Sequence, residues 1–578
     1  MCLPYGGHML SRRAFLAGAL LPASGGRDDA WPALERNWAD VSSRGEPWSP
    51  EHAMAREFRL TGDPALKRRV AETIGRGVRE AYHAGAVKTG NWWNWEIGVP
   101  KRLLDLAILV GHRDDGLIEA VDHFVRPWRL LFYRGTSTAA NRTDLCLVTL
   151  LNGILSRDPR KISRAAEALS PVFRYVTSGD GLYRDGSFIQ HSTVPYQGTY
   201  GVSMLHGIGA ILRTLCGTPW EITDPALGNV FAAVEHSFLP FLHEGRMMDL
   251  VSGRAIARKP HGDRRRARAF TDALDLLGES ASASQRARWR ELIANPPTGH
   301  RLMPAGARAV HRREGWTAAL SMSSHRVAHY EHGNGENLRG WHTGAGMLYW
   351  WGEGHGDHYS GDFWHTVDPY RLPGTTVSTK RLPDGAGGAW GENCPPARWV
   401  GGASDGVHAT VGQHLFGLES TLEARKSWIF LDDMVVCLGA GITCRDGVPV
   451  ETVVDNRRTH ARLTLGDGWA HLEGHGGYLF DGSVRVRQDE YTTLWFDHGT
   501  DPTDARYVYA LLPNADLAAT KAARVTVVAN TPAQQGVTAG DLTAVNFWRP
   551  GTVAGITVTE PSAILYRPGH FLVAESQG

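Results

Sequence analysis

The side chains best suited to proton transfer lie in a glycine-rich stretch between residues 180 and 201. It reads DGLYRDGSFIQHSTVPYQGTYG and precedes an apolar, helix-like run. His191 and Tyr200 lie nine residues apart in it, and both can donate or accept a proton in catalysis. Loops held by rigid helices often carry such groups. A structural interpretation stays open, in which His191 is a hydrogen-bonded loop residue and Tyr200 begins a helix.

A second unusual stretch, NWWNWEIG at residues 91–98, contains three tryptophans within four positions. Flat indole faces beside amides and a carboxylate suit a groove in which sugar rings stack and sugar hydroxyls form hydrogen bonds. Trp92 and Trp93 are therefore candidate sugar contacts. The alternative, a packed helix junction with satisfied polar groups, stays open from this stretch alone.

Asn141 lies in the run NRTD, directly before the apolar segment that starts at Leu145. Its amide is a good N-cap for a helix, and Asp144 would stabilise the first turn of that helix. The same amide can instead point into a cleft and bind a ligand. The sequence leaves both interpretations of Asn141 open.

Two further runs carry charged side chains that suit an anionic ligand. Arg254 and Arg258 in RAIAR lie one turn apart if the run is helical, and such a pair can clamp a carboxylate or sulfate. A solvated basic face is the commoner outcome of this spacing. Glu336 and Asn337 lie in NGENLRGW, just past an expected domain boundary, and clefts between domains are preferred ligand sites.

These motifs follow one another in a fixed order: NWWNWEIGVP, AANRTD, DGSFIQHSTVPYQGTYG, SGRAIAR and NGENLRGW. In this order, and with the nine-residue interval from His191 to Tyr200, they resemble polysaccharide lyase family 8. That family contains hyaluronate, chondroitin AC and xanthan lyases. The resemblance extends from about Asn91 into the second half of the chain, which is shorter than many members.

The resemblance implies β-elimination on an acidic, uronic-acid-containing polysaccharide, without a metal or another cofactor. It implies that Asn141 binds the uronate carboxylate and that His191 and Tyr200 are the acid–base pair. It also puts Arg254 beside the tyrosine and makes Glu336 the carboxylate that braces the site. The implied substrate-binding residues are Trp92, Trp93, Arg258 and Asn337.

The chemistry of elimination explains why these side-chain types are needed. The proton to be removed lies on carbon 5, beside a carboxylate whose charge opposes carbanion formation, and hydrogen bonds from Asn141 would offset that charge. A tyrosine with a pKa of about 10 is protonated at neutral pH. We expect Arg254 to favour the Tyr200 phenolate and His191 to take or share its proton.

The pattern of apolar residues divides the chain into a helical and a β-rich half. Apolar runs such as 202–215 recur between short Gly, Pro and Asp loops up to about residue 295, whereas short, partly alternating runs follow from about residue 305. We predict an α+β multidomain fold, an incomplete α/α toroid followed by antiparallel β-sandwich domains. The predicted segments are an export signal at 1–26, the toroid at 27–300, a central β-sandwich at 301–515 and a small C-terminal β domain at 516–578.

Composition and the N-terminus indicate where the protein acts. The formal net charge is +1, so no global basic field indicates nucleic acid, and no apolar run is long enough to span a membrane. Paired Arg12 and Arg13 precede a short apolar run and small residues, which is typical of a twin-arginine export signal. We expect a secreted monomer.

Several functions remain to be distinguished. A lyase acting on hyaluronan or chondroitin is the leading hypothesis, and a xanthan lyase of the same family is the alternative. A glycoside hydrolase would use Glu96 or Glu336 as its acid, but no carboxylate pair is evident from the sequence. A non-catalytic sugar-binding protein would keep the tryptophans without needing His191, Tyr200 and Arg254 together.

Overall fold

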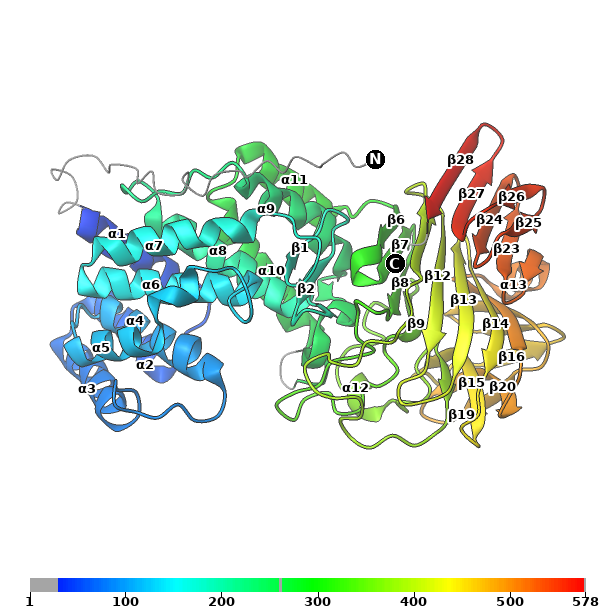
Figure 1. The fold of residues 1–578 in the computed structure, drawn as a ribbon, viewed down its shortest axis with the longest axis horizontal. Helices are drawn as coiled ribbons and strands as arrows, with labels where there is room; N and C mark the ends of the chain where they lie inside the picture. The colour runs from blue at the N-terminus through cyan, green and yellow to red at the C-terminus, as the bar shows by residue number, and fades with distance from the viewer. Residues whose placement is uncertain (1–29, 259–261, 576–578) are drawn as a thin grey trace, which may run out of the picture.

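The computed structural model describes residues 30–258 and 262–575, so the predicted export signal lies outside the described residues. Helices occupy one end of an elongated molecule and β-sheets occupy the other (Figure 1). The predicted class, a helical N-terminal region followed by antiparallel β-sandwiches, is confirmed. No helix in the described ranges is long and apolar enough to span a bilayer.

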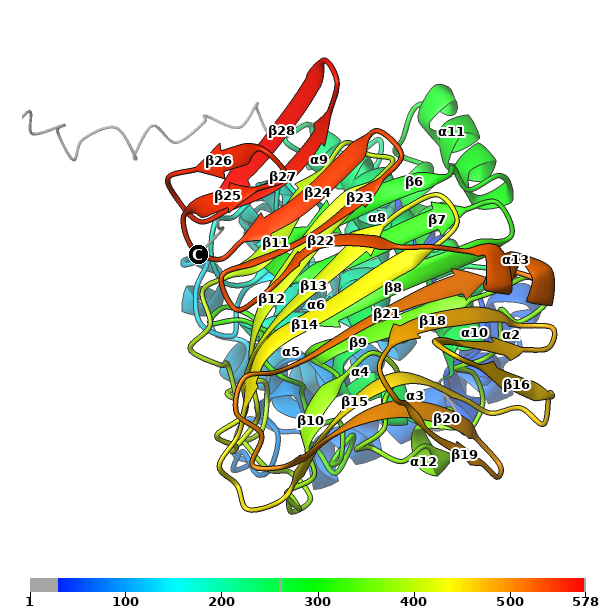
Figure 2. The same cartoon turned by 90° about the vertical axis from the view of Figure 1, so that its right-hand side faces the viewer.

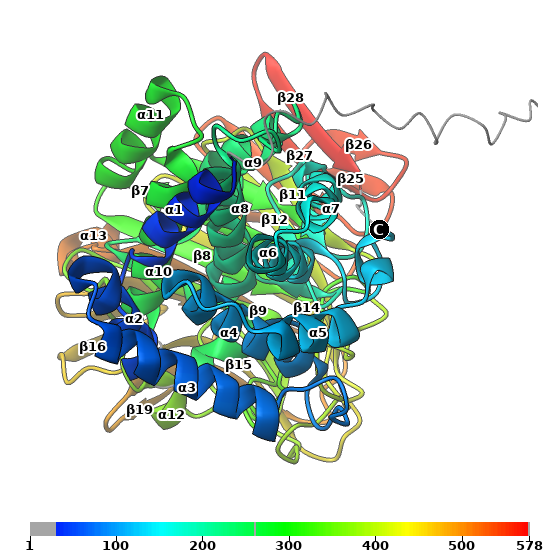
Figure 3. The same ribbon diagram turned by 90° about the vertical axis from the view of Figure 1, so that its left-hand side faces the viewer.

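The helical end consists of successive helices joined by short connections, which lie in front of the sheets when the molecule is seen from that side (Figure 3). The helices are α1 (Ala30–Ser42), α2 (Pro50–Thr61), α3 (Pro64–Glu80), α4 (Val99–Leu109), α5 (Asp115–Phe124), α6 (Ala139–Ser156), α7 (Pro159–Leu169), α8 (Val202–Leu215), α9 (Leu227–Ala233), α10 (Asp263–Gly278) and α11 (Ala283–Ala294). The apolar run 202–215 thus forms α8, which packs closely on α6. A Cβ at Gly207 would lie 2.6 Å from Cγ2 of Thr143, so glycine permits this approach.

The β-rich part starts with a four-stranded antiparallel sheet in the order β6-β7-β8-β9. Its strands are β6 (Gly299–Met303), β7 (Arg308–Arg313), β8 (Trp316–Met322) and β9 (Ala345–Trp351). Strand β9 is buried along its whole length, because its two faces enter different cores. Met347 and Tyr349 pack with the helices, whereas Leu348 and Trp350 pack inside the sandwich. This sheet therefore joins the helical region firmly to the β-domains.

An eight-stranded sheet forms the face of the molecule turned away from the helices (Figure 2). Its order is β11 (Val400–Ser404), β12 (Ala409–Phe416), β13 (Glu423–Phe430), β14 (Val435–Thr443), β21 (Ala505–Pro513), β18 (Gly476–Asp481), β17 (Trp469–Leu472) and β16 (Leu463–Gly466). A second four-stranded sheet has the order β10 (Thr376–Ser378), β15 (Pro449–Arg457), β20 (Thr492–Thr500) and β19 (Arg485–Gln488). Short helices α12 (Phe363–Thr366) and α13 (Leu517–Ala522) lie in the connections.

A smaller five-stranded sheet packs on the outer face of the eight-stranded sheet through its own apolar cluster. Its order is β22 (Thr526–Asn530), β23 (Gln534–Ala539), β24 (Leu542–Phe547), β27 (Ser562–Arg567) and β28 (His570–Glu575), and a separate hairpin joins β25 (Gly551–Val553) to β26 (Ile556–Val558). The loops between the helical region and β6–β9 bring together most of the side chains singled out from the sequence.

Candidate active site

A three-stranded hairpin positions His191 between the helices and the sheets. Strands β1 (Gly181–Leu182), β2 (Phe188–Gln190) and β3 (Val194–Pro195) form it. His191 and Ser192 make the tight bend after β2 with φ angles of 56° and 64°, a conformation that costs free energy for residues other than glycine. Surrounding contacts must therefore hold this bend.

Asp180 supplies those contacts. Its carboxylate accepts hydrogen bonds from the Ser192 backbone at 2.6 Å and from the side chains of Gln190 and Thr138, both at 2.7 Å. Gln190 in turn accepts a bond from the Ala140 backbone at 3.1 Å. Burial raises the pKa of Asp180, and these donors oppose the rise. One carboxylate thus couples the His191 bend to the start of α6.

Tyr196 and Tyr200 lie on and beside the π-helical turn Gln197–Gly201 that leads into α8. Their rings are in edge contact, with centroids 4.7 Å apart, and the His191 ring lies 4.8 Å from that of Tyr200. Gly253 has a φ of 51°, and a Cβ there would overlap the Tyr196 ring. Glycine at this position therefore lets the segment bearing Arg254 approach both tyrosines.

Glu331, from the loop between β8 and β9, is the centre of the cluster. Its Oε1 lies 2.5 Å from Nδ1 of His191 and accepts a bond from Nη1 of Arg254 at 3.2 Å. Its Oε2 accepts bonds from the Tyr196 hydroxyl and, at 3.1 Å, from the Arg254 backbone. The Glu331 side chain is fully buried. A single carboxylate from the β-region thus fixes three groups of the helical region.

Arg254 links this carboxylate to both tyrosines. Its Nη1 donates to the Tyr196 hydroxyl at 3.0 Å, and its Nη2 lies 3.4 Å from the Tyr200 hydroxyl. Its Nε also forms an ion pair with Glu336 at 3.1 Å. Burial opposes the charge on the guanidinium, but the facing Tyr196 and Glu331 raise the pKa of Arg254 overall. Arg254 is therefore a permanent cation between the two phenols.

The electrostatics differ from the expectation that Arg254 makes Tyr200 acidic. Burial raises the pKa of Tyr200 above its ordinary value, and the opposing effect of Arg254 is smaller. Burial and the Glu331 charge raise the pKa of Tyr196 still further. Although burial also opposes ionisation of Glu331, the bond from His191 and the charges of His191 and Arg254 lower its pKa overall. An ionised Glu331 requires Nδ1 of His191 to donate, which leaves Nε2 as a proton acceptor.

Glu336 braces the arginines rather than the acid–base pair. It accepts two bonds from Arg258, at 2.6 Å from Nε and 2.9 Å from Nη2, besides its ion pair with Arg254. The RAIAR run is a 3₁₀ turn, Gly253–Ala257, and not an α-helix. Both arginines reach the same carboxylate, so they form a paired clamp and not a solvated basic face.

Asn141 lies inside α6 and does not cap it. Thr138 occupies the N-cap position, and Asn141 is the third helical residue. The capping interpretation of Asn141 was therefore wrong, because the N-cap lies three residues earlier, at Thr138. Asp144 pairs with Lys101 at 2.9 Å instead of serving a cap. Within the described residues the Asn141 amide has no hydrogen-bond partner.

The three tryptophans of residues 91–98 have different environments. Trp95 packs against Tyr82 and Phe124 in the helical core. Trp92 and Trp93 are only partly buried, and the guanidinium of Arg129 lies 5.3 Å from the Trp92 ring centroid. All three indoles are partly buried against the helical core, and Trp95 differs from the other two in its contacts with core aromatic rings.

A tryptophan that sequence reasoning missed forms one wall of the site. Trp390 lies on a glycine-rich loop with a φ of 60° and is 38% exposed. Its ring lies 5.7 Å from that of His191 and 5.0 Å from the Arg254 guanidinium. Its exposed indole beside the acid–base residues can stack on a sugar ring.

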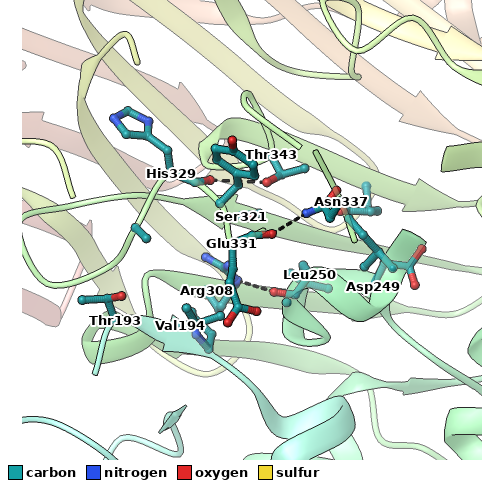
Figure 4. A pocket seen from close by; sticks show the side chains of 16 residues that line it. Thr193, Val194, Asp249, Leu250, Arg308, Ser321, His329, Glu331, Asn337 and Thr343 are labelled. Atoms are coloured by element: carbon teal, nitrogen blue, oxygen red, sulfur yellow. Dashed lines mark hydrogen bonds between the residues drawn. The ribbon is translucent and has the colours of Figure 1, made fainter. Parts of the chain in front are cut away.

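Asn337 holds the loop that carries Glu331. Its side-chain amide donates to the Glu331 backbone carbonyl at 2.8 Å, as Figure 4 shows. Both residues line a small pocket of about 30 Å³ with Asp249, Leu250 and Arg308. Asn337 thus holds the backbone of Glu331 in place.

No group of three or more His, Cys, Asp or Glu side chains in residues 30–258 and 262–575 is arranged to hold a metal ion. In the β-region, His358 is partly buried and His355 stacks on His475 with ring centroids 4.0 Å apart. These histidines therefore pack as side chains of the β-region.

The fold and this cluster define a carbohydrate-active lyase with a helical region and β-sandwiches. Residues 52–295 match the N-terminal alpha-helical domain of polysaccharide lyase family 8, residues 298–486 its super-sandwich domain, and residues 526–573 its C-terminal beta-sandwich domain. The chain belongs to polysaccharide lyase family 8 and is an enzyme of that class, as its motifs predicted.

Individual relatives agree with this assignment. The chain is 40% identical to a hyaluronate lyase of Thermasporomyces composti, over 88% of this chain and 76% of that protein. It is 30% identical to a xanthan lyase of Bacillus sp. (strain GL1), over 86% of this chain and 63% of that protein. The structure of a Streptomyces coelicolor A3 chondroitin AC lyase with chondroitin sulphate superposes with a TM-score of 0.88 at 41% identity, covering 95% of this chain and 93% of that one.

Proposed function

We propose that this lyase cleaves hyaluronan or chondroitin at the bond to carbon 4 of the uronate and leaves a 4,5-unsaturated uronate end. The observation that carries the proposal is the arrangement of His191, Tyr200 and Arg254 around one buried carboxylate. The buried amide of Asn141 follows Ala140, whose backbone bonds to Gln190, the residue before His191. The similarity to a hyaluronate lyase and a chondroitin AC lyase at about 40% identity supports these two polymers.

In the proposed mechanism Asn141 donates hydrogen bonds to the uronate carboxylate, where negative charge develops as the carbon 5 proton leaves. Because burial keeps Tyr200 protonated, the phenolate must form within the site. His191 Nε2 accepts that proton, and the Glu331 carboxylate 2.5 Å from Nδ1 stabilises the resulting imidazolium.

The elimination then proceeds through the Tyr200 oxygen. The phenolate takes the carbon 5 proton, the electrons of the C–H bond form the double bond between carbons 4 and 5, and the bond from carbon 4 to the glycosidic oxygen breaks. The leaving oxygen takes the proton from Tyr200, which restores the phenolate. One group serves both steps if both atoms lie on one face of the sugar ring.

The remaining predicted site residues have supporting roles in this proposal. Arg254 favours the phenolate form of Tyr200, and Glu336 holds Arg254 and Arg258 in place through an ion pair with each. We propose that Trp92 and Trp93, together with Trp390, stack on sugar rings along the cleft. We propose that Arg258, at the end of the Gly253–Ala257 turn, and Asn337, on the loop of Glu336, also bind substrate.

The pairing of the carboxylates supports elimination over hydrolysis. A glycoside hydrolase needs two carboxyl groups facing the scissile bond. Glu331 is fully buried, and Glu96 lies between Lys88 and Arg129, at 2.7 Å from each. Glu336 is likewise held by two arginines.

Xanthan lyase is the second candidate, because relatives with that activity share the fold. The Bacillus enzyme is 30% identical, and the structure of a Paenibacillus xanthan lyase superposes with a TM-score of 0.78 at 26% identity. We favour hyaluronan or chondroitin because the Thermasporomyces composti hyaluronate lyase and the Streptomyces coelicolor A3 chondroitin AC lyase, at 40% and 41% identity, are more similar to this chain than either xanthan lyase. We also propose export through the twin-arginine signal at 1–26, action as a secreted monomer, and the domain limits 27–300, 301–515 and 516–578.

One assay separates these candidates. The protein without residues 1–26 is incubated with hyaluronan, chondroitin, chondroitin sulfates or xanthan, and the absorbance of the conjugated enoate is followed with and without EDTA. We expect absorbance to rise with hyaluronan or chondroitin and to be unaffected by EDTA. New reducing ends without that absorbance would indicate hydrolysis, and a rise with xanthan alone would indicate the second candidate.

A further inference from the structure

A second groove, lined by aromatic, aliphatic and charged side chains, lies beside the hairpin that carries His191. It has a volume of about 540 Å³ and is lined by Arg174, Tyr175, Tyr183, Arg184, Asn229 and Ala305 among others. Asn229 belongs to α9, and Ala305 follows β6. The groove is therefore formed by the helical and the β-rich parts together, where β1 and β2 lie between them (Figure 1).

The groove combines aromatic rings with positive charge. Arg184 is exposed, and its guanidinium lies 5.1 Å from the ring centroid of Tyr175. Within the described residues Arg184 has no carboxylate partner. Arg174 is also exposed and pairs with Asp224 at 3.2 Å. Tyr183 lies partly buried alongside, with its hydroxyl donating to the Gly179 carbonyl at 2.7 Å.

The one carboxylate among the lining residues is fully engaged elsewhere. Asp185 accepts bonds from the Ser187 backbone at 2.8 Å, the Ser187 hydroxyl at 3.0 Å and the Ala305 backbone at 2.8 Å. It therefore ties the hairpin turn to the β-region and does not neutralise Arg184. The groove presents a cation and two phenol rings to solvent.

We infer that this groove is a distal subsite for an anionic sugar unit of the polysaccharide whose bond is cleaved beside Tyr200. The inference rests on the proposed function. A uronate polymer carries a carboxylate in every repeat, so units far from the scissile bond offer further anions. Arg184 binds such a carboxylate or a sulfate through its planar fork, and Tyr175 and Tyr183 provide flat faces for the ring.

The subsite shares its supporting structure with the catalytic loop. Tyr183 bonds to Gly179, and the next residue, Asp180, holds the His191 bend through Ser192. The subsite and the acid–base pair thus lie on opposite ends of one short hairpin. Long chains reach both places, whereas a short saccharide at the scissile position reaches only one.

The test compares KM for a long polymer with KM for the shortest cleaved saccharide in wild type, Arg184→Ala and Arg184→Glu. Arg290→Ala, which removes an exposed arginine on α11 that does not line the groove, is the matched control. We expect KM for the polymer to rise about twofold to fivefold in Arg184→Ala, as for loss of one exposed charge contact, and more in Arg184→Glu. We expect kcat and KM for the short saccharide to stay within error.

The outcomes separate this inference from the proposed function. If wild type cleaves the polymer but Arg184→Glu keeps the wild-type KM for it, the subsite is wrong and the function stands. If wild type cleaves none of the uronate polymers, the proposed function itself has failed. Repeating the polymer assay with unsulfated and sulfated chondroitin identifies the anion: a larger effect with the sulfated chain assigns sulfate, and equal effects assign the carboxylate.

Discussion

Two buried clusters in this protein contain the same kinds of side chain but differ in access. In the sandwich, Asp455 accepts bonds from Arg457 at 2.8 Å, Tyr478 at 2.7 Å and Trp350 at 3.1 Å. The side chains of Asp455 and Arg457 are completely shielded from solvent. The cluster around Glu331 also joins an arginine, a carboxylate and tyrosines, but it opens to the surface at His191, whose side chain is 19% exposed.

The difference shows that a buried ion pair is not by itself a sign of catalysis. In the sandwich the arginine and carboxylate cross-link strands, and nothing reaches them from outside. Where the helical and β-rich parts meet, the same pairing leaves the His191 ring in contact with the Tyr200 ring and with the exposed Trp390. Only side chains that substrate can reach, and that still have unpaired donor or acceptor atoms, can take part in catalysis.

The largest loss of activity is expected for Tyr200→Phe. The ring and its packing against Tyr196 remain, but the oxygen that transfers the proton is lost, so kcat should fall by about 10²–10⁴. Polymer binding, measured by calorimetry, should stay close to wild type. A substrate with a very good leaving group at carbon 4 refines this test. If it restores most of the rate, His191 is the base and Tyr200 only protonates the leaving oxygen.

Asn141→Ala should have the next largest effect. Loss of a donor to the developing charge costs about 10²–10³ in kcat, while α6 keeps its length because Thr138 begins it. The melting temperature should therefore change little. A stable variant with normal turnover would remove Asn141 from the catalytic set.

Arg254→Met should move the pH dependence of kcat. Arg254 lowers the pKa of Tyr200 against the raising effect of burial, so its loss raises that pKa further. If the phenolate is the base, kcat rises with pH as Tyr200 ionises, and this rise moves to higher pH in the variant. Each unit by which the pKa of Tyr200 increases lowers kcat at neutral pH about tenfold. If Tyr200 only donates a proton, kcat falls at high pH as Tyr200 ionises. That falling limb of the pH profile then moves to higher pH in the variant. A pH profile in which neither limb moves would contradict the claim that Arg254 lowers the pKa of Tyr200.

The smallest effect is expected for Trp92→Ala and Trp93→Ala. A stacking contact with an indole is worth about 0.5–1.5 kcal/mol, so kcat/KM should fall by no more than about tenfold for each. Trp95→Ala is the comparison, because Trp95 packs in the core and its loss should lower the melting temperature. If the Trp92 or Trp93 variant melts as low as the Trp95 variant, packing is its main role.

Sequence reasoning found the proposed acid–base residues better than the carboxylate that holds them in place. Residues His191, Tyr200 and Arg254 stand out by type and spacing, and the structure brings them together. Glu331 was missed because its partners lie 77 to 140 positions away, and no local pattern marks such a contact. The nearby Glu336 has the more conspicuous motif, although it holds arginines only.

Secondary structure was likewise easier to predict than the contacts of individual side chains. The run 202–215 shows its helix through its apolar residues. Three tryptophans in residues 91–98 look alike in the sequence, yet only Trp95 packs against core aromatic rings. Trp390 was missed because a glycine-rich loop brings it to His191 from 199 positions away.

The most direct test measures kcat/KM and melting temperature together for Glu331→Gln and Asp455→Asn. Both changes remove one negative charge from a buried cluster at nearly constant size. We predict that Glu331→Gln loses about 10² or more in kcat/KM, because Nδ1 of His191 no longer faces a carboxylate. Asp455→Asn should lose about 3–5 kcal/mol of stability and keep near-normal kcat/KM at temperatures where it is folded. A Glu331→Gln variant with wild-type kcat/KM would contradict the account.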